Sequence, residues 1–177
     1  MRVIPNGFDI DEPKICSLDI ASFRELNGIS KENVVVGCVG RFHPAKDHRN
    51  FVDAAAVLAK TYPSVIFMMV GPELTAENSD LMAWIDGHGL RSRFVLLGER
   101  SDIPLCMSAM DIFCSPSRTE AFPLVVGEAM LMGRSCVVTD VGDTAFVVGN
   151  TAVVVERENS MALAAGLSRL LDLPNKE

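Results

Sequence analysis

Short runs of apolar residues alternate with stretches of helical periodicity along most of the chain. The apolar runs predict strands at residues 33–40, 64–71, 94–98, 111–117, 135–139 and 152–155. Between them, helical spacing predicts helices at residues 47–62, around 81–85, and at 103–110, 123–132 and 161–171. The first ~32 residues are mixed and polar, and only a turn at Pro5-Asn6-Gly7 is predicted there.

This alternation predicts the fold class. Strands that are apolar throughout are buried on both faces, which is typical of a parallel sheet covered by helices. We therefore expect a doubly wound, Rossmann-like α/β domain with about six strands in three layers, αβα. Such a sheet binds its ligand at the carboxyl ends of the strands, where the strand order reverses. The loops to inspect follow residues 39, 70, 97, 115 and 139.

Motifs that would assign a common cofactor to those loops are missing. No GxGxxG follows the first predicted strand, which argues against a nicotinamide or flavin site. The sequence also lacks GxxxxGK[ST], which argues against a P-loop enzyme.

Composition adds the size and the setting. With 177 residues, 49% of them hydrophobic, the chain is expected to form one ordered domain over residues 1–177. The net charge of −7 argues against a general nucleic-acid or membrane-surface binder. No apolar run approaches the ~18 residues of a spanning helix. Five cysteines without a CxxC pair indicate small buried hydrophobes in a reducing cytoplasm, not disulfides or a zinc site: Cys16, Cys38, Cys106, Cys114 and Cys136.

The loop after the first strand carries two permanent cations. Gly40 allows a tight turn, and Arg41 and Lys46 follow within six residues. A forked donor and a mobile point charge at the mouth of a parallel sheet suit a diphosphate, although two solvated surface charges would look the same. Asp47 is expected to cap the next helix. His43, beside a proline, is expected at the surface.

The loop after the fourth strand leads into an apolar helix. Pro123 is predicted as its first residue, since a missing N–H costs nothing there. The free N–H groups of Leu124 and Val125 then face an anion at the positive end of the helix. Glu128 lies one turn further on, where a carboxylate suits the two hydroxyls of a ribose. Glu120 precedes the helix and suits a second polyol or a developing positive charge.

Plainer explanations for these acids remain open. Glu128 could be a carboxylate on the exposed edge of a buried helix, and Glu120 a helix-start acid favoured by the dipole. A third acidic pattern, Asp9-Ile-Asp11, matches a metal-binding Asp-x-Asp, but it follows no buried strand. No metal site is therefore predicted.

Taken together, these residues resemble a family. Glu120 and Glu128, eight apart, are similar to the Glu-x7-Glu signature of retaining glycosyltransferases of the two-Rossmann-domain (GT-B) architecture, glycosyl transferases group 1. The resemblance covers residues 2 to about 171 and concerns only the C-terminal, donor-binding half. Further matching segments are Val3–Asp9, Gly40-Arg41 with Lys46, Val70-Gly71, Leu97-Gly98, Ser115-Pro-Ser, Glu128-Ala-Met and Thr139–Asp143.

The resemblance implies a role for each matching residue. Arg41 and Lys46, with Gly40, are expected to hold the donor diphosphate, and Glu120 to contact the transferred sugar. Those two cations and Glu120 are the expected catalytic residues. The resemblance also implies that Glu128 binds the ribose. The sugar and the distal phosphate are expected to meet the backbone of Phe122, Pro123, Leu124 and Val125. The base is expected to lie against Leu97, Gly98 and Arg100. The family often has glycine where this chain has Ala121 and Pro123.

The resulting expectation is an enzyme of the hexosyltransferase type that uses a nucleoside diphosphate sugar without a metal or other cofactor. The acceptor would bind an N-terminal domain absent here, so this fragment alone is expected to be inactive. Polysaccharide biosynthesis and a cytoplasmic, membrane-associated full-length enzyme are expected. Two alternatives remain: a nucleotide-sugar epimerase on a similar fold, and a nucleotide-binding module without catalysis.

Overall fold

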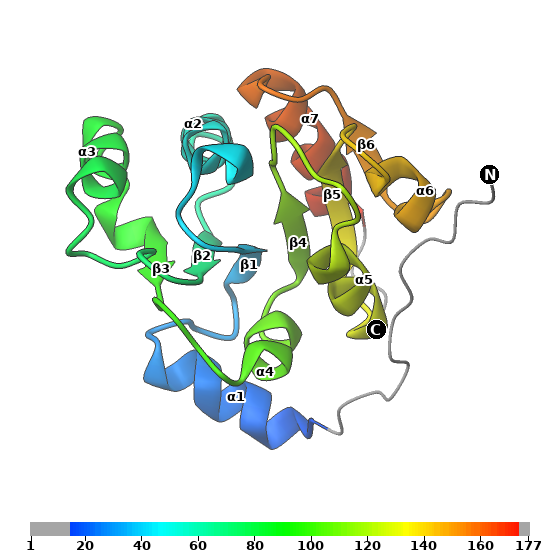
Figure 1. The fold of residues 1–177 in the computed structure, drawn as a ribbon. Coiled ribbons are helices and arrows are strands. Elements are labelled where there is room, and N and C mark those ends of the chain that lie inside the picture. Colours follow the sequence, from blue (N-terminus) through cyan, green and yellow to red (C-terminus); the bar gives the residue numbers. More distant parts are fainter. Residues whose placement is uncertain (1–14, 174–177) are drawn as a thin grey trace, which may run out of the picture.

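A computed structural model describes residues 15–173 and contains one six-stranded sheet (Figure 1). The strand order is β3-β2-β1-β4-β5-β6, and every neighbouring pair is parallel. This confirms the doubly wound α/β prediction. The strands are β1 (Val34–Val39), β2 (Val65–Val70), β3 (Phe94–Leu96), β4 (Ile112–Ser115), β5 (Ser135–Thr139) and β6 (Val153–Val155).

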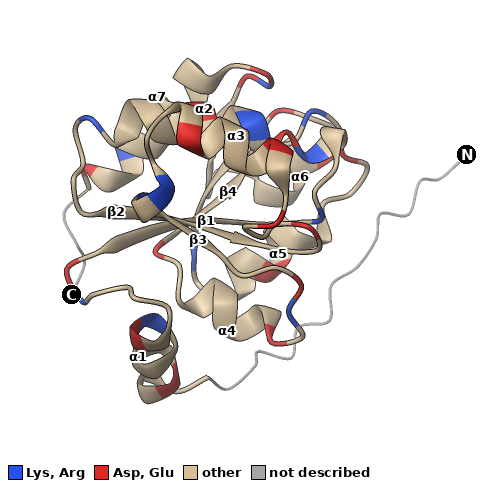
Figure 2. Ribbon diagram, turned by 90° about the vertical axis from the view of Figure 1, so that its left-hand side faces the viewer, with Lys and Arg blue, Asp and Glu red and all other residues tan. Residues whose placement is uncertain are grey.

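Helices cover both faces of the sheet and complete three layers (Figure 2). Helices α2 (His48–Leu58), α3 (Ser79–Gly87) and α7 (Ser160–Leu171) pack on one face. On the other face lie α4 (Ile103–Ser108) and α5 (Leu124–Leu131), with α1 (Ser17–Leu26) against α4 and α6 (Thr144–Val148) against α5. No helix between residues 15 and 173 has the length and apolar character needed to span a bilayer.

The sheet has one hydrophobic core on each of its faces, because successive side chains of a strand point to opposite sides. In β2, Phe67 and Met69 pack under α2 and α3, whereas Met68 and Val70 face the layer of α4 and α5. The ring of Phe51 on α2 meets Phe67 edge-on, at 6.1 Å between centroids. The central strands β1, β2 and β4 are thus largely buried on both faces, as the unbroken apolar runs predict, whereas the edge strands β3 and β6 are only partly covered and Val154 is exposed.

Helix α1 is a correction to the sequence analysis, which expected no element in the first ~32 residues. Its hydrophobic stripe is weak, but Phe23 is buried in the core on the α4 and α5 face, and Arg24 adds polar contacts to the domain. The Arg24 side chain donates to the Ala109 carbonyl at 2.9 Å and to Asp111 Oδ2 at 2.8 Å. The predicted turn at Pro5–Gly7 lies outside the described residues.

Two other helices, α6 and α2, differ from the prediction. Helix α6 was not expected, because its five residues are too short to show a period. The helix predicted over residues 47–62 begins at His48 and ends at Leu58, after which the chain turns into β2.

All five cysteines are free thiols, and four are buried as expected. Burial raises the pKa of Cys106 to about 11 and that of Cys136 to about 12, and it also raises the pKa of Cys114 well above its usual value. The expectation of burial is wrong for Cys16, which lies exposed at the start of α1. Its thiol donates to Asp19 Oδ2 at 3.1 Å.

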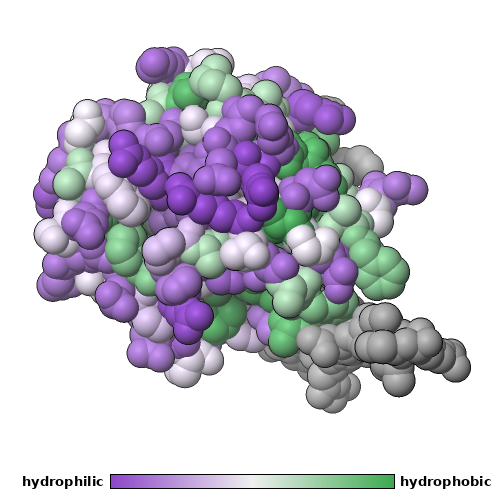
Figure 3. Space-filling model, turned by 45° about the horizontal axis from the view of Figure 1, so that its top comes forward, coloured by the Kyte–Doolittle hydropathy of each residue, from purple (hydrophilic) through white to green (hydrophobic). Residues whose placement is uncertain are grey.

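The loops at the carboxyl ends of β1, β2 and β3 are bonded to one another. The Gly40 N–H donates to the Val70 carbonyl at 2.9 Å, and the Gly71 N–H donates to the Gly98 carbonyl at 2.7 Å. Gly71 has φ 146° and approaches the first loop so closely that an added Cβ would lie 2.1 Å from the Gly40 oxygen. Hydrophilic side chains cover most of this edge of the sheet (Figure 3).

Replacing Gly71 with alanine should therefore destabilise the fold. We expect Gly71→Ala to lower the free energy of unfolding by more than about 2 kcal/mol, because a backbone atom must move and the φ angle is unfavourable. Gly87→Ala is the matched control, since its Cβ would meet nothing within 4 Å. Urea unfolding followed by the fluorescence of Trp84, the single tryptophan, measures both variants. Equal stability of the two variants would contradict the prediction.

Candidate functional site

The strand order reverses between β1 and β4, the central pair of the sheet. The chain continues from β1 to α2 on one face and from β4 to α5 on the other, and such a reversal marks the ligand-binding crevice of open α/β sheets. We use the name crevice for the position between the loops that follow these two strands. We name residues 40–47 the cationic loop and residues 116–123 the glutamate loop. The predicted charges therefore meet at the ligand-binding position of this fold.

Lys46 and Glu120 join the two loops directly. Lys46 Nζ lies 2.6 Å from Glu120 Oε1, and their side chains are 25% and 11% exposed. Neither plainer explanation holds for this pair. Lys46 is not a freely solvated charge, and Glu120 stands four residues before α5, bonded to the facing loop instead of to a helix start. Arg41, by contrast, is exposed.

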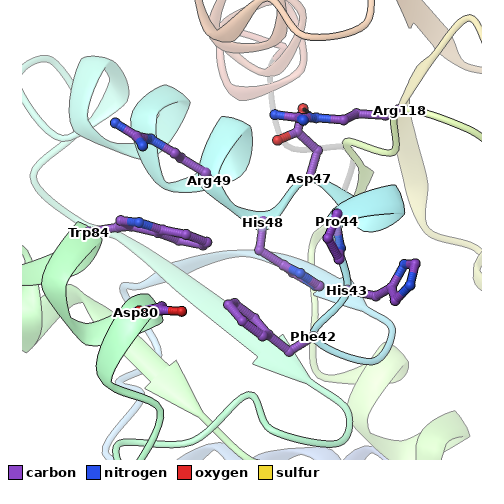
Figure 4. A pocket seen from close by; sticks show the side chains of 9 residues that line it. All are labelled: Phe42, His43, Pro44, Asp47, His48, Arg49, Asp80, Trp84 and Arg118. Carbon is purple, nitrogen blue, oxygen red and sulfur yellow. Dashed lines mark ion pairs between the residues drawn. The ribbon is translucent and has the colours of Figure 1, made fainter.

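A second ion pair ties the loops together beside the first. Arg118 Nε lies 3.0 Å from Asp47 Oδ2, and the Arg118 N–H donates to the Ala45 carbonyl at 2.8 Å. Asp47 lies at the N-cap position of α2, but the expected capping bond is absent: its backbone is left-handed, with φ 47°, and its 3%-exposed carboxylate is directed to Arg118 (Figure 4). The pairing with Arg118 thus replaces the predicted cap.

The glutamate loop ends at the start of α5. Pro123 is buried and occupies the N-cap position with non-helical ψ 89°, so the prediction that it is the first helical residue is wrong by one position. Leu124 and Val125 open the helix, where amide N–H groups have no acceptor within the helix. Glu128 is exposed on the next turn, which leaves the edge-residue explanation open for it. Phe122 is half-buried.

The segment predicted to flank a base lies beyond β3. Leu97 is half-buried, and Gly98 is buried with φ 63°. The Arg100 guanidinium binds both oxygens of Asp102, at 2.8 and 2.6 Å, and lies 5.6 Å from the ring centre of Phe23. The bonds from Arg100 hold the pKa of Asp102 below its usual value. Arg100 is therefore bound to the start of α4 and is not part of the Lys46–Glu120 pair.

A cavity of about 270 Å³ lies on the α2 and α3 side of the cationic loop. His48 stacks on Phe42 with ring centres 5.8 Å apart, and Phe42 contacts Trp84 at 5.5 Å. Burial, with the nearby Lys46 charge, lowers the pKa of His48 to about 4, so the ring is neutral at pH 7. Figure 4 shows the lining residues: Phe42, His43, Pro44, Asp47, His48, Arg49, Asp80, Trp84 and Arg118.

Several residues of this site were not predicted. Arg118 and Ser117 belong to the glutamate loop, and Ser117 donates to Glu120 Oε1 at 2.7 Å. The sequence signal for Arg118 was its position two residues before Glu120, and Ser117 also belongs to the matching segment Ser115-Pro-Ser. His43 is exposed as expected, and its Nδ1 accepts from the Ala45 N–H at 3.2 Å. The Asp9-Ile-Asp11 pattern lies outside the described residues.

The family model and two curated relatives that match this chain all belong to the glycosyltransferases. A family model for glycosyl transferases group 1 matches residues 33–173. The Escherichia coli UDP-Gal:alpha-D-GlcNAc-diphosphoundecaprenol alpha-1,3-galactosyltransferase is 32% identical over 154 residues, 85% of this chain and 39% of that protein. The 2-deoxystreptamine glucosyltransferase of Streptomyces kanamyceticus is 30% identical over 177 residues, 97% of this chain and 45% of that protein. The chain thus spans less than half the length of these relatives.

Solved structures share the fold. The crystal structure of Anabaena HepE in complex with UDP and glucose matches with a TM-score of 0.86 and 33% identity, over 97% of this chain and 47% of that chain. The C-terminal domain of a glycosyl transferase group 1 family protein from Francisella tularensis matches with a TM-score of 0.79 and 22% identity. That match covers 94% of this chain and 89% of that one, and at this identity it concerns the fold alone.

The buried His48 predicts a pH dependence of stability. Its pKa is about 4 in the folded chain and near the usual 6.5 when unfolded, so the unfolded chain binds the extra proton between these values. Its contribution is therefore complete above pH 6.5 and is lost as the pH falls toward 4, by up to ~3 kcal/mol. Urea unfolding at pH 7 and pH 4.5 measures this loss.

His48→Gln should flatten that part of the pH dependence, whereas His43→Gln, at an exposed position, should leave it unchanged. If both variants keep the slope of the parent, the titration belongs to other groups and the assignment to His48 is wrong.

Proposed function

Because this chain belongs to the glycosyl transferases group 1 family, we propose that it is the donor-binding half of a retaining glycosyltransferase. The observation that carries the proposal is the pair of Lys46 and Glu120, which joins a cation and a carboxylate across the β1–β4 crevice. The crystal structure of HepE with UDP and glucose, 33% identical over almost all of this chain, supports a UDP-sugar as the donor.

Arg41 and Lys46 would hold the donor diphosphate. Arg41 is exposed at the mouth of the crevice, and the start of α5 adds the amides of Leu124 and Val125. An ammonium carries three N–H donors, so Lys46 can keep its bond to Glu120 and still reach a phosphate oxygen. In our proposal this charge cluster neutralises the diphosphate, and no metal ion is needed.

The rest of the nucleotide would lie along the same edge. Glu128 would accept hydrogen bonds from the two ribose hydroxyls, since its carboxylate is exposed one turn into α5. The base would rest against residues 97–100, whose backbone is fixed by the bond between Gly71 and Gly98. Phe122 and Pro123 would meet the sugar and the distal phosphate.

The reaction follows from these positions. The bond between the sugar carbon and the diphosphate oxygen breaks, and the electron pair leaves with the diphosphate toward Arg41 and Lys46. The sugar becomes oxocarbenium-like, and Glu120 contacts it. An acceptor hydroxyl attacks from the same face and gives its proton to the leaving phosphate, which retains the configuration. The protein supplies position and charge in this proposal, as in other electrostatically driven transfers.

The acceptor would bind elsewhere in a longer protein. The relatives are more than twice as long as the part matched here, and we propose that an N-terminal domain supplies the acceptor site. The isolated chain would then bind nucleotide without turning it over, because no cleft can close over the sugar. Relatives include a lipopolysaccharide core biosynthesis mannosyltransferase, so we propose a cytoplasmic, membrane-associated role in polysaccharide synthesis.

Calorimetric titration of the chain with UDP, GDP and ADP tests donor binding, and we expect UDP to bind most tightly. Analysis of products from a radiolabelled donor, with the full-length protein, separates the alternatives: transfer, an isomerised donor, or no reaction. Binding of no nucleotide by the chain would overturn the proposal.

Glu128→Ala should weaken binding of UDP by ~1–3 kcal/mol, because a charge-assisted pair of bonds to the ribose is lost. Glu25→Ala on α1 is the matched control, since Glu25 is also exposed but far from the crevice. Calorimetry on both variants decides the matter. If Glu128→Ala binds UDP as the parent does, Glu128 is only an edge residue.

Arg41→Ala and Lys46→Ala should each weaken binding of UDP on the order of tenfold and leave binding of uridine nearly unchanged. The loss should shrink in high salt, which screens partly exposed charges. Arg169→Ala, at an exposed arginine on α7, serves as the control. Equal losses of affinity for UDP and for uridine would place these cations away from the phosphates.

The proposal also predicts that EDTA leaves UDP binding unchanged. A loss of UDP binding in EDTA would contradict metal independence.

A further inference from the structure

The contacts of the Glu120 carboxylate are unequal between its two oxygens. Lys46 Nζ at 2.6 Å and Ser117 Oγ at 2.7 Å both donate to Oε1. Among residues 15–173, no hydrogen bond to Oε2 accompanies them. One oxygen is therefore anchored by the protein, while the other is left for a hydroxyl of a bound molecule.

Ser117 is itself held by a buried hydroxyl from the neighbouring strand. The Thr139 hydroxyl, at the end of β5, donates to the Ser117 carbonyl at 2.6 Å and lies 3.3 Å from the Ser115 carbonyl. Thr139 is 0% exposed and Ser117 is 1% exposed. Because buried hydrogen bonds without competing water are geometrically strict, the backbone of Ser117 is held in place, and the burial of the residue confines its hydroxyl beside Glu120.

The backbone around Glu120 is fixed from the same side. Gly142, with φ 52°, packs so closely that an added Cβ would lie 2.0 Å from the Glu120 carbonyl oxygen. The Asp143 N–H donates to the next carbonyl, that of Ala121, at 2.9 Å. The end of β5 therefore supports the glutamate loop at Ser117, Glu120 and Ala121.

We propose that Thr139 and Ser117 are positioning residues: the hydroxyl of Thr139 fixes Ser117, and Ser117 fixes Glu120 Oε1 so that Oε2 is directed at the sugar of the donor. Lys46 alone could not do this, because it is drawn toward the diphosphate and its flexible side chain can turn about the carboxylate. Ser117 keeps Glu120 in place whether or not a donor is bound. This proposal rests on the proposed function of Glu120.

Two substitutions at Thr139 separate positioning from packing. Thr139→Val keeps the shape but removes the hydroxyl, whereas Thr139→Ser keeps the hydroxyl and removes only a methyl group. Calorimetry on the chain with UDP and with UDP-glucose or UDP-galactose gives the factor by which the sugar strengthens binding. We expect this factor to fall about fivefold to tenfold in Thr139→Val and Ser117→Ala, and to change less than twofold in Thr139→Ser.

Binding of UDP itself should change less than twofold in all three variants, which excludes unfolding as the cause. If Thr139→Ser loses as much as Thr139→Val, the residue acts by packing and the proposal is wrong. If the parent binds no UDP, the proposed function fails first, and the proposal fails with it.

A direct readout does not depend on the identity of the sugar. In crystal structures of the free chain, Glu120 Oε1 should stay within hydrogen-bond distance of residue 117 in Thr139→Ser and leave it in Thr139→Val. An unmoved carboxylate in Thr139→Val would overturn the proposal even where the sugar adds nothing to the affinity of the parent.

Discussion

The adjacency of β1 and β4 is the constraint on which the candidate site depends. These strands are separated in the chain by two other strands, yet they pair in the middle of the sheet. The chain leaves them toward opposite faces, and their loops meet at the carboxyl edge, at the position where open α/β sheets bind their ligands. Both ion pairs between these loops, Lys46 with Glu120 and Asp47 with Arg118, exist only because of this strand order.

Two of the cations in the crevice are paired with carboxylates of the facing loop. Lys46 balances Glu120, and Arg118 balances the buried Asp47. Arg41 is exposed and free of a counter-charge in the glutamate loop, while His48 stays neutral because burial lowers its pKa. In a chain with a net charge of −7, the cationic loop therefore keeps one cation, Arg41, that neither ion pair uses.

Periodicity was sufficient for the sheet, because every strand is apolar on both faces. It was insufficient for α1, which is attached by the burial of Phe23 and by the contact of Arg24 with Asp111, 87 residues away. The loops that carry the site were recognised from their charges. The bond between Lys46 and Glu120 could not be, since periodicity does not encode which strands become neighbours.

Predictions from residue type and neighbouring sequence failed where a contact with a residue far along the chain sets the conformation. Asp47 has the residue type of a helix cap, but the pull of Arg118 and the left-handed backbone remove its side chain from the helix start. Ser117 and Thr139 belong to the matching segments Ser115-Pro-Ser and Thr139–Asp143, but their contact with each other depends on the register of β4 and β5. Such contacts require the assembled sheet.

The burial of the cysteines has a practical consequence for chemical labelling. A thiol reacts as its thiolate, and the raised pKa values of Cys106, Cys114 and Cys136 suppress that form. Burial also shields these three thiols and Cys38 from the reagent. Cys16 is the exposed thiol, and it lies on α1, away from the crevice. A maleimide dye added to the unmodified chain therefore attaches at one known place, and reaction at a second thiol reports that the sheet has opened.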